Sequence, residues 1–94
     1  MESVFRGQLE KELDRVLKPE VINTVMQISK NLPLKSAEDF CFGYIVGDII
    51  AGTFAEARTR YGRDTTAEEM DEALNIIYRR ALEIKGAIKL AMNR

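Results

Sequence analysis

The stretch Phe40–Ala57, FCFGYIVGDIIAGTFAEA, decides how the rest of the chain must fold. Its first sixteen residues include a single charged side chain, Asp48, and the stretch holds four of the seven aromatic residues of the protein. Because burial of apolar surface is the main driving force of folding, a segment this apolar needs cover on most sides. We therefore expect the remaining segments to pack around it.

The residues that precede this stretch indicate the start of a helix. Ser36 opens the sequence SAED, in which a serine stands three positions before an acidic residue, a pattern that resembles a capping box. Glu38 and Asp39 also suit the positive end of a helix dipole. At the other end, Gly62 is well suited to the residue that closes a helix. The sequence therefore predicts a helix over 37–61.

The competing interpretation of the same stretch is a β-hairpin over 44–51. Its flanks favour strands, and Gly47-Asp48 could form a two-residue turn between them. An isolated hairpin is only marginally stable, however, and no other segment resembles a third strand. We therefore favour the helix.

Three further segments carry apolar residues at the three-to-four spacing of an amphipathic helix. Pro19 separates the first two of these segments, because proline cannot donate the backbone hydrogen bond that a continuous helix needs. Thr66 and Glu69 match the capping box at the start of the last one. The predicted helices cover 3–17, 19–31 and 67–92.

Together these elements predict an all-α fold in a single domain over 1–94. The two long helices, 37–61 and 67–92, are joined by a short connection and should form an antiparallel hairpin within a small bundle. The two short helices could lie along this hairpin as one broken layer, or fold back to make a four-helix bundle. The pattern does not decide between these two arrangements.

Small residues recur every four positions in the central helix, at Gly43, Gly47, Ala51 and Ala55. A glycine in a helix interior costs about 1 kcal/mol relative to alanine, so close packing against another helix is expected to offset it. We expect a non-enzymatic protein–protein interaction or assembly domain that pairs with itself, or with another helical protein, through its two long helices. The predicted interface residues are Gly43, Gly47, Asp48, Ala51, Ala55, Ile77, Ala81, Ile84 and Ile88.

Composition removes several classes of function. The chain has no histidine, one cysteine (Cys41) and a net charge of −1, which disfavours nucleophilic catalysis, a cysteine zinc site and a general attraction to nucleic acid. The charged N-terminal segment does not resemble a signal peptide, and the central apolar run is short and interrupted by Asp48. We therefore expect a cytoplasmic protein without a membrane span, cofactor, catalytic residue or bound metal.

Asp48 is the one residue whose position is unusual, because a carboxylate among isoleucines and glycines needs a partner. Candidate partners are Tyr44, Thr53 and either Arg79 or Arg80, unless one side of the helix is exposed to solvent. If Asp48 is buried with a basic partner, its replacement by alanine should destabilise the protein by several kcal/mol. A functional role is also open to Asp48, as a ligand-binding or acid–base residue in a small-molecule enzyme.

Two charged clusters suggest further functions. Glu68, Glu69 and Glu72 could hold Mg²⁺ in a metal-dependent enzyme, although a second acidic pair on a later helix is absent. An acidic first turn also stabilises a helix without any metal. The basic cluster would instead allow nucleic-acid binding through an arginine-rich helix tip. The tip comprises Arg58, Arg60 and Arg63, with Arg79 and Arg80 farther along the chain.

Overall fold

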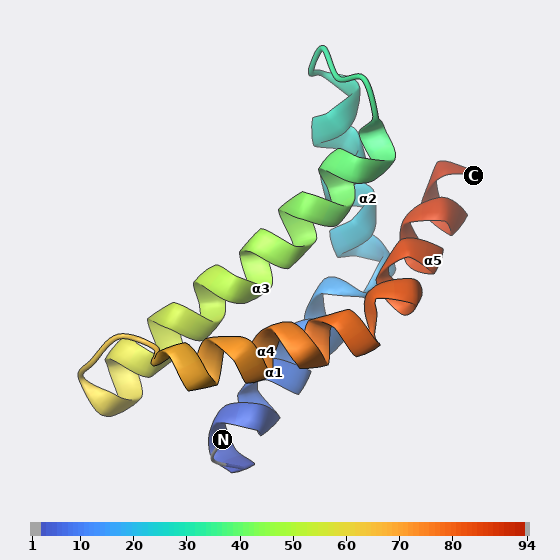
Figure 1. Ribbon diagram of the computed structural model, residues 1–94. Coiled ribbons are helices and arrows are strands. Elements are labelled where there is room, and N and C mark those ends of the chain that lie inside the picture. Colours follow the sequence, from blue (N-terminus) through green and yellow to red (C-terminus); the bar gives the residue numbers. More distant parts are fainter. Residues whose placement is uncertain (1–2, 94) are drawn as a thin grey trace.

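The structure is a computed structural model that describes residues 3–93, and these residues form five helices (Figure 1). The described part of the chain contains no strand, so the all-α prediction is confirmed. The central apolar stretch lies within one continuous helix, which excludes the hairpin over 44–51. The helices are α1 (Ser3–Val16), α2 (Pro19–Lys30), α3 (Ala37–Tyr61), α4 (Ala67–Arg79) and α5 (Ala81–Met92).

Local capping interactions define the ends of α3 and the start of α4. The hydroxyl of Ser36 accepts a hydrogen bond from the backbone N–H of Asp39 at 3.1 Å. Gly62 ends α3 in the left-handed conformation, with φ of 66°, which glycine adopts without steric cost. Thr66 and Glu69 form a reciprocal capping box at the start of α4.

The hydrophobic core draws on all five helices. Three side chains of α1 are 1% exposed or less, and they join the apolar faces of α2, α3 and α5 in one cluster. The smaller apolar face of α4 completes the core. The buried cluster comprises Leu9, Leu13, Val16, Ile22, Val25, Met26, Cys41, Ile45, Ile49, Ala73, Ile77, Ile84 and Ile88.

The prediction of one helix over 67–92 is wrong, because α4 and α5 are separate helices that meet at Arg80. Arg80 has φ of −102° and ψ of 9°, and Figure 1 shows the chain changing direction there. α4 packs against α1, whereas α5 packs against α2 and α3. Since α1 and α2 themselves change direction at Lys18-Pro19, a straight helix could not follow both.

Ion pairs hold Arg80 at this bend. Its guanidinium contacts Asp14 at 3.1 Å and Glu10 at 3.7 Å on α1, and Glu83 at 3.0 Å within α5. These contacts connect the junction of α4 and α5 to α1. The pKa of the Glu83 carboxyl is lowered by its hydrogen bond to Arg80.

The predicted hairpin of two long helices is also corrected. α3 and α4 diverge from their connecting turn (Figure 1), and α3 packs mainly against α1, α2 and α5. α1 and α2 each pack against α3, which resembles the predicted broken layer, but the hairpin that this layer was expected to cover is absent. This packing leaves one long side of α3 without a neighbouring helix among the described residues.

Candidate functional site

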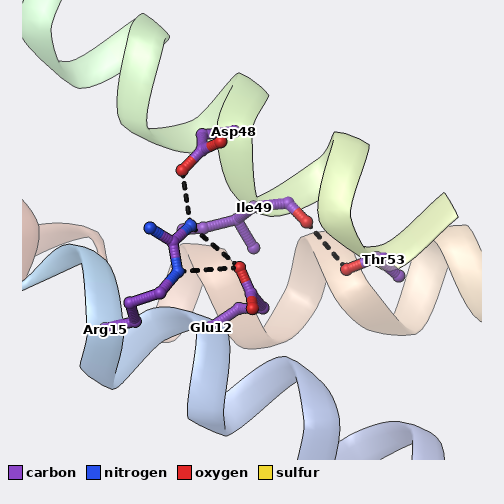
Figure 2. A network of polar contacts seen from close by, with 5 residues as sticks. All are labelled: Glu12, Arg15, Asp48, Ile49 and Thr53. Carbon is purple, nitrogen blue, oxygen red and sulfur yellow. Dashed lines mark hydrogen bonds and ion pairs between the residues drawn. The ribbon is translucent and has the colours of Figure 1, made fainter. Parts of the chain in front are cut away.

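Asp48 is paired with Arg15 of α1, a partner that the sequence did not indicate. Figure 2 shows the Arg15 guanidinium between two carboxylates, donating to Asp48 Oδ2 at 2.6 Å and to Glu12 Oε2 at 2.9 Å. The Asp48 hydrogen bond, followed by that of Glu12, raises the pKa of Arg15. The side chains of Arg15 and Asp48 are 44% and 43% exposed, so this network bridges α1 and α3 at the surface.

None of the expected partners of Asp48 takes that role. The hydroxyl of Thr53 is buried and donates to the backbone carbonyl of Ile49 at 2.8 Å, as Figure 2 also shows. Arg80 lies at the bend between α4 and α5 and is paired with other carboxylates. The pairing with Arg15 depends on how α1 lies across α3, which local spacing does not report.

An open groove of about 390 Å³ runs beside Asp48, between α3 and the junction of α1 with α2. Two of the charged residues that line it, Arg15 of α1 and Asp48 of α3, form an ion pair with each other. The hydroxyl of Thr24, also on its wall, already donates to the carbonyl of Glu20 at 2.8 Å. The lining residues are Arg15, Glu20, Val21, Thr24, Val25, Tyr44 and Asp48.

Two of the three glutamates at the start of α4, Glu69 and Glu72, are engaged in contacts within the chain. Glu69 accepts hydrogen bonds from the backbone N–H of Thr66 and the guanidinium of Arg63, both at 2.9 Å, and these contacts lower its pKa to about 2. Glu72 is ion-paired with Arg6 of α1. Within the described residues, no group of three or more acidic, cysteine or histidine side chains is placed to hold a metal ion.

The arginines at the end of α3 have acidic partners in the same chain. Arg58 contacts Asp64 at 2.8 Å, and Arg60 contacts Glu56 at 2.7 Å. Arg63 pairs with Glu69. These pairs reduce the positive potential that a nucleic-acid contact would require.

The small residues of the central helix lie together on the uncovered side of α3. Gly43, Gly47, Ala51 and Ala55 are all exposed. A Cβ atom added at either glycine would find no neighbouring atom within 4 Å. Two aromatic side chains flank them, Tyr44 at 46% exposure and Phe54 at 37%. We call this surface the α3 face; it comprises Gly43, Tyr44, Gly47, Ala51, Phe54 and Ala55.

The predicted interface residues on the last two helices lie elsewhere. Ile84 and Ile88 of α5 have no exposed surface, and Ile77 of α4 is 5% exposed. Ala81 is half-buried at the start of α5. The three isoleucines form part of the core of the same chain. The structure therefore brings the small residues of α3 and Asp48 to the surface. It separates them from the three isoleucines, which are buried in the core.

A second set of exposed apolar side chains follows the outer side of α4 and α5. Tyr78 and Leu82 are 81% and 83% exposed, and Leu74 and Leu90 are also exposed. Residues 74, 78, 82 and 90 are spaced by multiples of four, which is the signal that could have identified them in the sequence.

By length and composition, α3 is the one helix among the described residues that could cross a membrane. Its most apolar window of 18 residues has a mean hydropathy of 1.3, and 28% of that window is buried. Core helices of soluble proteins pass the same test, and α3 contributes Cys41, Ile45 and Ile49 to the core.

Comparison of the chain with protein-family models, curated proteins and solved structures found no match.

Proposed function

We propose that this protein is a non-enzymatic assembly domain that forms a homodimer through the α3 face. The observation that carries the proposal is the exposure of Gly43 and Gly47 in the middle of a 25-residue helix. Each costs about 1 kcal/mol relative to alanine in such a position. No contact within the described chain uses the close approach that these glycines permit.

The third glycine of α3 supports this argument by contrast. A Cβ atom at Gly52 would lie 3.1 Å from Oε2 of Glu12, so packing against α1 accounts for a small residue there. Gly43 and Gly47 have no comparable neighbour among the described residues. A helix from outside the chain, lying against the α3 face, would supply one.

The size and the composition of the face favour a second copy of the chain as that helix. A domain of 94 residues buries a modest core of its own, and twofold pairing is the commonest form of assembly. Aromatic side chains are enriched at protein–protein interfaces relative to the rest of the protein surface. Tyr44 and Phe54 are the aromatic side chains exposed on this face.

Two glycine substitutions test the proposal, one on the α3 face and one, as a control, on α5. Gly47 and Gly86 are both exposed helix residues with no atom within 4 Å of an added Cβ, so neither site obstructs the start of a leucine side chain in the monomer. We expect Gly47→Leu to be monomeric by size-exclusion chromatography with light scattering, because its side chain blocks close helix approach. The unaltered chain and Gly86→Leu should both be dimeric, and all three should show the same helical circular dichroism spectrum.

Either of two results would contradict this assignment. A dimer that survives Gly47→Leu would place the interface elsewhere, for example on the outer side of α4 and α5. A monomeric unaltered chain would remove the proposed function altogether.

A further inference from the structure

The α3 face has a symmetric sequence, and this symmetry carries an inference that rests on the proposed dimer. Gly43, Tyr44 and Gly47 precede Ile49 by six, five and two residues. Ala51, Phe54 and Ala55 follow Ile49 by two, five and six residues. Each small or aromatic position therefore has a counterpart of the same kind at an equal distance on the other side of Ile49.

Helical geometry divides this face into two sides. With about 100° between successive residues, Tyr44, Ala51 and Ala55 fall on one side of its midline. Gly43, Gly47 and Phe54 fall on the other side by the same geometry. Each aromatic side chain thus shares its side of the face with two small residues that lie beyond the level of Ile49, in the other half of the face.

We propose that two copies pair their α3 helices antiparallel, about a twofold axis perpendicular to the helix at the level of Ile49. About this axis, each side of one α3 face meets the same side of the partner's face, and the two helices run in opposite directions. Tyr44 then packs over the partner's Ala51 and Ala55, and Phe54 packs over the partner's Gly43 and Gly47. The glycines provide the space that the phenylalanine ring needs.

Shape alone also permits a parallel pair, and the charges select the antiparallel one. By the same helical geometry Phe40 and Arg58 fall near the midline, nine residues before and nine residues after Ile49. Arg58 is exposed, whereas Phe40 is half-buried and also packs against the core of its own chain. In a parallel pair Arg58 would face the partner's Arg58. In the antiparallel pair it faces the partner's Phe40, beside the partner's Asp39, where a cation–π contact and an ion pair are both favourable.

The charged residues at the two ends of α3 also favour antiparallel pairing. Its first turn carries Glu38 and Asp39, and its last turn carries Arg58 and Arg60. Antiparallel pairing places the acidic end of one helix beside the basic end of the other, and it opposes the two helix dipoles. Arg58 is 66% exposed and its partner Asp64 is 81% exposed, so that pair holds the arginine only weakly.

A single spin label separates the two orientations. Thr59 is exposed at the edge of the α3 face, ten residues from Ile49, and Cys41 is replaced by alanine so that one thiol remains. In the antiparallel dimer of Cys41→Ala/Thr59→Cys, two labels lie about 30 Å apart, from twenty residues at 1.5 Å each. In a parallel dimer they lie within about 20 Å, since packed helices are 8–10 Å apart.

Pulsed electron resonance measures this distance, with the dimer mass of the labelled protein determined in parallel. A dominant distance near 30 Å is the expected result. A dimeric mass with a short distance would overturn the antiparallel arrangement and leave the proposed dimer intact. A monomeric mass without dipolar coupling, if the unaltered chain is also monomeric, would overturn both.

Discussion

Asp48 lies in the most apolar stretch of the chain, yet its carboxylate is partly exposed and joined to Arg15 across the surface. The pair connects α1 to α3, and Glu12 extends it along α1. Because both charges remain in contact with water, screening by solvent limits what their attraction contributes to stability. The position of Asp48 on the edge of the α3 face thus reflects an exposed helix surface rather than a buried charge.

The first prediction concerns this ion pair. Asp48→Asn should lower the free energy of unfolding by about 0.2–1 kcal/mol, the range for exposed ion pairs. Urea unfolding at neutral pH measures the change. A loss of several kcal/mol is expected only for a buried carboxylate, so a loss of that size would mean that Asp48 is enclosed.

The second prediction concerns Glu69, whose side chain is 12% exposed. Its pKa falls from 4.5 to about 2 in the folded protein, first through Arg63 and then through the N–H of Thr66. A carboxyl with a lowered folded-state pKa stabilises the fold above its unfolded pKa, and this contribution is lost as the pH falls. We expect the stabilisation to be complete above pH 4.5 and to disappear between pH 4.5 and about 2.

Glu69→Gln is the matched variant, because glutamine keeps a capping acceptor but does not ionise. Urea unfolding of both proteins at several pH values gives the difference between them. The two stabilities should differ at about pH 6 and converge toward about pH 2. A constant difference over this range would show that the Glu69 charge is not the stabilising feature.

At the scale of single residues, the sequence predicts interactions between near neighbours well. The Ser36 cap and the Thr66 capping box involve residues three positions apart, so their chemistry is visible in the sequence. The partner of Asp48 lies 33 residues away. Nothing in local spacing distinguishes Arg15 from the other arginines, because the choice depends on how two helices cross.

At the scale of elements, α3 has two unlike sides. One buries Cys41, Ile45 and Ile49 against α1, α2 and α5, and the other is the α3 face. The sequence shows this division, since large and small side chains segregate around the helix.

The break between α4 and α5 at Arg80, unlike the two sides of α3, is not visible in the sequence. No proline, glycine or capping residue marks it, and it arises because α4 follows α1 while α5 follows α2. Such a bend is a consequence of tertiary packing, which overrides the local preference for one continuous helix.

The third prediction concerns the glycines of α3. Gly43→Ala and Gly47→Ala should each raise the stability of the monomer by about 1 kcal/mol, because alanine is the better helix former and nothing obstructs its Cβ. Both should weaken the dimer, because the added methyl groups fill the space assigned to Phe54 of the partner subunit. The free energy of unfolding of dilute, monomeric protein should therefore rise, whereas the free energy of dissociation of the dimer should fall. The two quantities are measured separately.

Gly52→Ala is the control for this prediction. Its Cβ would lie 3.1 Å from Glu12 Oε2, so the gain in monomer stability should be smaller and the dimer should be unaffected. If Gly43→Ala and Gly47→Ala instead destabilise the monomer, the α3 face would already be packed within one chain.

At the scale of the whole molecule, the all-α class follows from the apolar periodicity, but the division between core and interface does not. The seam of Ile77, Ile84 and Ile88 has the pattern of an intermolecular coiled coil, yet it closes the core of its own chain. Because a core and an interface use the same side chains, periodicity alone cannot separate them. The arrangement of α1 and α2 makes the difference, since they help to cover that seam and leave the α3 face open.

Sedimentation equilibrium of the unaltered chain, over a range of micromolar concentrations, tests the central claim most directly. The monomer mass is 10.7 kDa. We predict a mass that rises with concentration to twice this value, as expected when the α3 faces of two copies pair. A mass that stays at 10.7 kDa at every concentration would contradict the account.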